Sequence, residues 1–237
     1  MRHNILFIAA FATLSAAFAP ISLSTQSKLT QTPPDELYRF LASPNNWPKI
    51  VASSASVESS QGVDLERPLQ VGKNVDEIFG LPPILPLSVT WTCVKSVAPT
   101  KLKAGRLEFY SCDGVPGIAS QCKMNFDIEN NNNNNAAGSN LSLEMEFQPE
   151  SPIAILATPV LTLDNALALK VLLPSVLESM NDAYLPLNKF RNLMGALYGG
   201  AGLAHLFDLY FGGSQLLVSA GAPPFESLPL EGQALAL

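Results

Sequence analysis

Residues 122–129, Cys-Lys-Met-Asn-Phe-Asp-Ile-Glu, and residues 141–148, Leu-Ser-Leu-Glu-Met-Glu-Phe-Gln, alternate apolar and polar side chains without a break. Successive side chains of a β-strand point to opposite faces, so this period of two predicts two strands with one dry and one solvated face each. Antiparallel sheets that cover a core have this pattern. The acids of both strands are expected on the solvated face: Asp127, Glu129, Glu144 and Glu146.

Weaker strand signals precede these two segments. They lie at residues 53–60, 75–79, 88–97 and 102–110, where β-branched and aromatic side chains gather. The asparagine run at 130–135 separates the two clearest strands. Because the cost of closing a loop grows slowly with its length, this run is expected to be a flexible hairpin loop.

Helical signals flank the strands. Residues 32–36, Thr-Pro-Pro-Asp-Glu, predict the start of a helix that runs to Leu41, because proline and acids suit the first turn. Pro44 ends it, and residues 45–48 predict a turn or a short second helix.

After the strands, the apolar period becomes helical again from Thr162. Either Thr162 or Asp164 is expected to cap the start of this helix. Pro152 and Pro159 argue against a continuous helix before that point, and Pro174 predicts a kink or the first turn of a second helix. One apolar stripe is expected to face the sheet: Leu169, Leu173, Val176, Met180, Tyr184 and Leu187.

The N-terminus has the three parts of a secretory signal peptide. Arg2 is basic, residues 5–14 are apolar but too short for a stable anchor, and Ser15 and Ala17 are small residues at the −3 and −1 positions. We therefore expect cleavage after Ala17. Residues 18–31 are rich in hydroxyl side chains and contain no acid, which is typical of a transit peptide.

The junction Ser15-Ala16-Ala17-Phe18-Ala19-Pro20 resembles the ASAFAP motif of algae with secondary, red-derived plastids. In that motif an aromatic residue begins the transit peptide, and Phe18 holds the position here. The resemblance implies delivery to the plastid by way of the secretory pathway. Plain secretion is the alternative.

Composition excludes several classes of site. The net charge is −6, and −7 without the signal, so phosphate-rich nucleic acid is not an expected partner. Cys93, Cys112 and Cys122 lack the close pairing of a zinc site, and His205 is the one histidine beyond the signal. We expect no metal and no cofactor.

The order of elements resembles the helix-grip fold of the START-like, polyketide cyclase/dehydrase and Bet v 1-related superfamily (SRPBCC). The features that carry the likeness are residues 32–41, the Asn-Asn-Trp-Pro of 45–48, the strands between 53 and 148, and the helix after 162. It implies an α+β domain at 32–190, with a curved antiparallel sheet wrapped around a long C-terminal helix. Residues 191–237 follow. Their apolar stretch is expected to be helical and to hold the domain against a thylakoid or envelope membrane.

The helix-grip resemblance implies a cavity between sheet and helix, lined by the dry faces of both. The expected lining is Trp91, Leu107, Phe109, Met124, Phe126, Leu143, Met145, Phe147, Met180 and Tyr184. The alternative is that these side chains simply fill a core. Aromatic residues and pliable methionines suit an adaptable apolar site, so the leading hypothesis is non-enzymatic binding or transport of a lipid, isoprenoid or pigment.

Two other functions stay open at this point. A cyclase or dehydratase acting on a polyketide or isoprenoid needs an inward acid, for which Asp76 or Glu77 are the best candidates. The pair His205 and Asp208 is a weaker catalytic signal. A membrane-attached assembly or scaffold protein would have a solid interior instead of a cavity. No residue is assigned a catalytic role.

Overall fold

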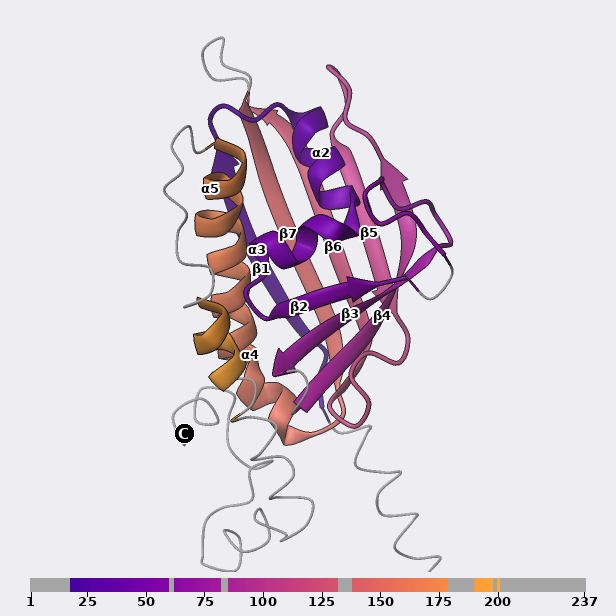
Figure 1. Ribbon diagram of the computed structural model, residues 1–237, viewed down its shortest axis with the longest axis vertical. Coiled ribbons are helices and arrows are strands. Elements are labelled where there is room, and N and C mark those ends of the chain that lie inside the picture. Colours follow the sequence, from indigo (N-terminus) through magenta and orange to yellow (C-terminus); the bar gives the residue numbers. More distant parts are fainter. Residues whose placement is uncertain are drawn as a thin grey trace, which may run out of the picture.

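Seven antiparallel strands form one curved sheet in the order β1-β7-β6-β5-β4-β3-β2 (Figure 1). The first strand therefore pairs with the last, and every other neighbour in the sheet is also a neighbour in the chain. The strands are β1 (Ile21–Leu29), β2 (Ser54–Glu58), β3 (Asn74–Leu81), β4 (Leu85–Val97), β5 (Gly105–Ser111), β6 (Ala119–Asn131) and β7 (Gly138–Pro149).

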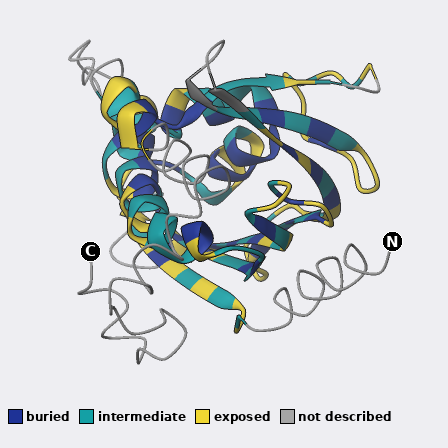
Figure 2. Ribbon diagram, turned by 90° about the horizontal axis from the view of Figure 1, so that it is seen from below, coloured by how far each residue is buried: buried dark blue, intermediate teal, exposed yellow. Residues whose placement is uncertain are grey.

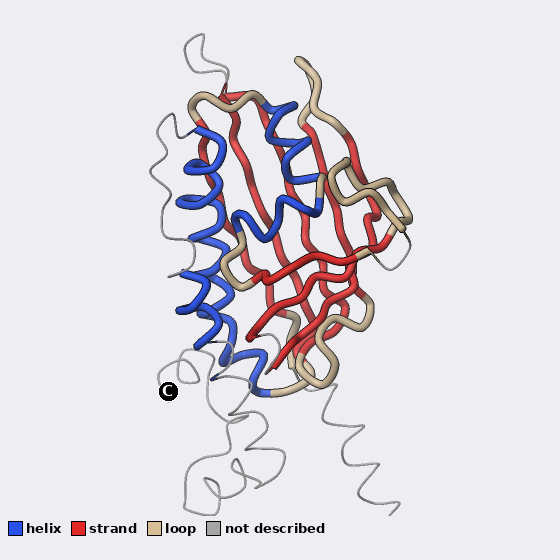
Figure 3. The backbone as a smooth tube through the Cα atoms, viewed as in Figure 1, coloured by secondary structure: helices blue, strands red, loops and turns tan. Residues whose placement is uncertain are grey.

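Helices cover the concave face of the sheet (Figure 3). Between β1 and β2 lie α2 (Pro34–Ala42), a 3-10 turn (Pro44–Asn46) and α3 (Trp47–Ile50). After β7 comes one long helix made of α4 (Pro152–Leu167), a π turn (Ala168–Leu172) and α5 (Leu173–Glu178). The structure is a computed structural model and describes residues 18–59, 62–81, 85–131, 138–178, 190–197 and 200.

This arrangement confirms the predicted α+β helix-grip fold. The predicted alternation is present in β6 and β7: Phe126 and Leu143 are buried, whereas Asp127 and Glu144 lie on the convex face. Burial colours follow the same rule, with dark residues on the inside of the curved sheet (Figure 2). The main core joins the inner face of the sheet to α2, α3 and the long helix.

The first strand was not expected. Residues Ile21–Leu29 form β1 and pair antiparallel with β7, from Ile21 opposite Phe147 to Leu29 opposite Ser139. Leu29 is fully buried in the main core. The helix-grip sheet therefore begins ahead of residue 32, inside the segment whose composition is that of a transit peptide. The targeting role of residues 18–31 stays a prediction.

The long helix also begins earlier than its prolines indicated. Pro152 occupies the first turn, where a missing N–H costs nothing, and Pro159 lies inside α4. Extra side-chain hydrogen bonds reinforce the backbone around it: Thr158 Oγ1 donates to the Ala154 carbonyl, and Thr162 Oγ1 to the Thr158 carbonyl. Asp164 caps nothing; it lies within α4 and is buried.

The π turn changes which side chains face the sheet beyond it. Leu169 and Leu173 are buried as predicted, but Val176 is 45% exposed and Leu177 contacts the core instead. A π turn adds one residue to the helical repeat, so a stripe counted at 3.6 residues per turn loses phase there. Pro174 lies in the first turn of α5, one of its two predicted places.

Two contacts tie the long helix to the N-terminal part of the chain. Ser27 Oγ of β1 donates a hydrogen bond of 2.6 Å to the Leu169 carbonyl. At the end of α5, the Glu178 carboxylate accepts from the backbone N–H of Gln31 at 2.7 Å and of Thr32 at 3.3 Å. The helix is therefore held to the sheet edge near its middle and at its C-terminal end.

Residues Pro152–Glu178 are also long and apolar enough to cross a membrane, by length and composition alone. Core helices of soluble domains pass the same test, and this helix has one face on the sheet. Of the apolar segment 193–211, residues 193–197 and 200 are described; helical residues 190–197 bury Met194 completely in the core. His205 and Asp208 lie outside the described residues.

Candidate functional site

The predicted lining residues that the structure describes all lie on the concave side of the sheet. Met180 and Tyr184 fall outside the described residues. Met145 is half-buried, and the others are buried: Trp91, Leu107, Phe109, Met124, Phe126, Leu143 and Phe147. The sequence pattern thus predicted correctly that these side chains lie on the inner face of the sheet. Burial alone, however, does not distinguish a ligand site from a core.

At the α2–α3 end these side chains pack as a core. The ring of Phe109 meets that of Trp47 edge to face, with centroids 5.1 Å apart, and meets Phe126 in the same manner at 6.5 Å. Trp47 is fixed by its indole N–H, which donates 2.8 Å to the Leu41 carbonyl. Here Phe109 and Phe126 fill the interior, as the alternative reading of the lining proposed.

Other inward apolar side chains are less deeply buried. Phe79 of β3 and Met145 of β7 point inward but are only half-buried, and so is Leu161 of α4. A second small apolar cluster, formed by Ala119, Phe147 and Ala154, is separate from the main core. These side chains pack against the apolar clusters and remain partly accessible to solvent.

Two buried carboxyl groups face the same region; we call Glu77 and Asp164 the carboxyl pair. Glu77 of β3 is 4% exposed and accepts a 3.0 Å hydrogen bond from Trp91 Nε1 of β4. Asp164 of α4 is 2% exposed, and the Ser53 hydroxyl donates to its Oδ2. The pair brings together the curled end of the sheet and the long helix.

The interior keeps protons on the carboxyl pair at higher pH than water would. Burial, partly offset by the donors at Ser54 and Trp91, raises the pKa of Glu77 from 4.5 to about 7, and the charge of Asp164 adds to the rise. Burial likewise raises the pKa of Asp164 from 3.8 to about 6, against the lowering effect of donors at Ser53. Both groups change charge near neutral pH.

The polar groups around the carboxyl pair are not all satisfied. Asp164 Oδ1 and Ser54 Oγ are buried and have no hydrogen-bond partner among the described residues. Ser54 Oγ lies close enough to Glu77 to lower its pKa, although no hydrogen bond of regular geometry joins them. Buried polar atoms without partners are uncommon, and each one calls for an explanation.

Sequence reasoning found one half of the carboxyl pair and missed the other. Glu77 was a named candidate for an inward acid; Asp76, its neighbour, lies on the outer face and accepts from Thr90 Oγ1. Asp164 was taken for a helix cap. Its signal was present, because it is the only charged residue between Ser151 and Leu169.

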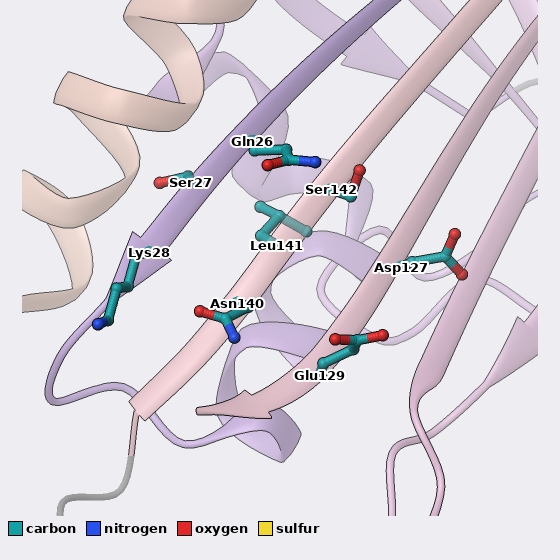
Figure 4. A pocket seen from close by; sticks show the side chains of 8 residues that line it. All are labelled: Gln26, Ser27, Lys28, Asp127, Glu129, Asn140, Leu141 and Ser142. Carbon is teal, nitrogen blue, oxygen red and sulfur yellow. The ribbon is translucent and has the colours of Figure 1, made fainter. Parts of the chain in front are cut away.

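A separate hollow of about 470 Å³ lies on the convex face, over β1, β7 and β6 (Figure 4). It is bordered by polar side chains, among them Lys28, Asp127 and Glu129, and by none of the predicted lining residues. Within the described ranges, no three His, Cys, Asp or Glu side chains gather as possible metal ligands.

Comparison with known proteins gives likeness of fold alone. No protein-family profile and no curated protein matches the chain. The solved structure of XoxI from Bacillus cereus is 11% identical and covers 67% of this chain and 96% of its own, with a TM-score of 0.48.

Two further solved structures have similar scores. The di-domain ARO/CYC BexL of the BE-7585A biosynthetic pathway is 17% identical, covering 68% of this chain and 48% of its own, with a TM-score of 0.46. Truncated norcoclaurine synthase from Thalictrum flavum is 9% identical, covering 69% and 96%, with a TM-score of 0.47. At such identities and TM-scores, these likenesses carry no argument about the chemistry of this chain.

Proposed function

We propose that the protein binds a hydrophobic small molecule on the concave face of its helix-grip fold, without catalysing a reaction on it. The observation that carries the proposal is the set of inward apolar side chains, Phe79, Met145 and Leu161, that stay half-buried beside the closed core. Apolar surface that folding leaves partly exposed inside a curved sheet is stabilised when a ligand removes it from water.

A plastid lipid, isoprenoid or pigment is the ligand class we propose, and it rests on the N-terminal sequence. The ASAFAP-like junction at Phe18 and the acid-free stretch behind it support delivery to a plastid, where such molecules are abundant. Attachment to a thylakoid or envelope membrane through the apolar segment after residue 191 belongs to the same proposal.

Native mass spectrometry of the processed protein, purified from its own organelle, tests the proposal. A mass above that of the chain, with a lipid or pigment recovered by extraction, is the expected result. A protein that copurifies with nothing and displaces no apolar dye would refute ligand binding and favour the scaffold alternative. The same spectrum reports the mature N-terminus.

A second candidate function is acid–base catalysis, as in a cyclase or dehydratase. It is favoured by the carboxyl pair, because inward acids with pKa values of about 7 and about 6 are suited to proton transfer near neutral pH. The Glu77→Gln variant discriminates the two: an enzyme loses conversion of the bound molecule while still binding it, whereas a carrier returns its ligand chemically unchanged.

A further inference from the structure

One oxygen of the carboxyl pair, Asp164 Oδ1, has no hydrogen-bond partner among the described residues. Trp91 Nε1–H can only donate, so Glu77 Oε2 accepts from it, and the Ser53 hydroxyl donates to Asp164 Oδ2. Asp164 Oδ1 and Ser54 Oγ then remain without partners among the described residues. The Ser54 hydroxyl can donate as well as accept, whereas an ionised Asp164 Oδ1 can only accept, so Asp164 Oδ1 is the atom that lacks a donor.

The carboxyl pair also lacks a positive charge. Within the described residues, no lysine or arginine forms an ion pair with Glu77 or Asp164; the ion pairs there are between residues on the protein's surface. The groups that face Glu77 from β2, β4 and α4 are Ser54, Trp91 and Asp164, none of them cationic. Buried charges are ordinarily paired, and among the described residues the carboxyl pair has no cationic partner.

Half-buried apolar side chains lie next to the carboxyl pair. Val57 stands opposite Glu77 in the sheet and Phe79 lies two residues along on the same face, and both are half-buried. On the helix, Asn165 follows Asp164 and its amide is 3.2 Å from the sulfur of half-buried Met145. A chain lying on this apolar surface can place its end at the pair.

We propose that the carboxyl pair binds the protonated primary amine of an otherwise apolar ligand. The inference rests on the proposed binding function and names the polar end of the molecule. An ammonium group supplies three donors, for Asp164 Oδ1, Ser54 Oγ and Glu77, together with the missing positive charge. Its binding favours two carboxylates, so a proton that either carboxyl carries beforehand is released to solvent.

The pH dependence of this site has a definite sign. An alkyl ammonium keeps its proton to about pH 10, whereas the carboxyl pair gains protons below pH values of about 7 and about 6. Affinity for an amine therefore falls on acidification, and affinity for an alcohol of the same length does not.

Competition with the neutral dye Nile red on the full chain tests the proposal, using dodecylamine, dodecanol and dodecanoate. We expect dodecylamine to bind at least about tenfold tighter than dodecanol at pH 8, and the preference to disappear at pH 5. Glu77→Gln and Asp164→Asn each remove the preference at pH 8, because dodecylamine loses an ionic partner. Asp76→Asn, which removes the neighbouring outward acid, is the matched control and keeps it.

The outcomes separate the two proposals. Equal binding of amine and alcohol by the natural chain, or an amine preference that survives Glu77→Gln and Asp164→Asn, overturns the amine site and leaves the apolar site standing. A preference that Asp76→Asn removes equally reflects only the acidic surface, and also overturns it. Failure of every chain to displace the dye overturns the binding function and the amine site with it.

Discussion

Replacing Glu77 by glutamine should make the protein more stable at alkaline pH and leave it almost unchanged at acid pH. The pKa of Glu77 is raised from 4.5 to about 7 in the folded protein. A raised pKa means that folding favours the protonated form, so the stability it gives is complete below pH 4.5 and is lost as pH rises through 7. Glutamine resembles the protonated acid and can still accept from Trp91 Nε1.

The size of the effect follows from the pKa values. One pKa unit corresponds to about 1.4 kcal/mol, so ionising Glu77 in the folded protein costs up to about 3 kcal/mol. The free energy of unfolding of Glu77→Gln, minus that of the natural chain, should therefore rise by about 2–3 kcal/mol between pH 4.5 and pH 8.5. Loss of the charge on Glu77 also eases ionisation of Asp164, which acts in the same direction.

Urea unfolding at pH 4.5, 6, 7 and 8.5, followed by tryptophan fluorescence, measures this difference. Asp76→Asn is the control, because Asp76 lies one residue away on the outer face, and its difference from the natural chain should stay flat. A flat difference for Glu77→Gln would show that the carboxyl is solvated. A difference of opposite sign would show that a cation pairs with Glu77, and either result refutes the account of the buried pair.

Three further predictions concern the fold. Phe109→Ala should lower the free energy of unfolding by about 3–5 kcal/mol, because Phe109 is 1% exposed between Trp47 and Phe126. Leu102→Ala is the control in the same urea titration: Leu102 is 96% exposed, so the free energy of unfolding should change by less than about 0.5 kcal/mol. Glu178→Ala should cost about 1–2 kcal/mol and speed amide exchange at Gln31 and Thr32, whose N–H groups it accepts; unchanged exchange there would contradict the contact. Gly114→Ala should lower the free energy of unfolding by about 2 kcal/mol or more, because φ is +54° and a Cβ would lie 2.3 Å from the Ala119 carbonyl oxygen. Gly62→Ala is the control in the same assay: φ is +66° there but a Cβ would meet open space, so the variant measures the backbone strain without the clash.

Local sequence pattern predicted most of the sheet and its facing. Strict alternation in β6 and β7 is a signal of one dry face, and it correctly assigned Phe126, Leu143 and the outward acids around them. The short helix before Pro44 was also predicted correctly, because proline and acids mark its first turn. These features depend on neighbours along the chain, which a single sequence contains.

Features that depend on distant parts of the chain were missed. β1 has the composition of a targeting segment, and only its partner β7, more than a hundred residues later, makes it a strand. The π turn displaced Val176 from the predicted stripe, since a phase shift has no signature in composition. Asp164 became half of a candidate site only because α4 lies against Ser53.

Under the proposed plastid import, the nine residues of β1 lie in the transit-peptide segment and also form one edge of the sheet. Its partner β7 lies far along the chain, so the sheet cannot complete its edge until residues 138–149 have arrived. On that proposed route, a precursor halted before residues 138–149 emerge would have no partner for β1. Trimming near residue 31 would remove Leu29 from the core and leave β7 as a bare edge, whereas trimming between Ala17 and Ile21 leaves the sheet whole. The β1–β7 pairing thus limits where a presequence could be removed without opening the edge of the sheet.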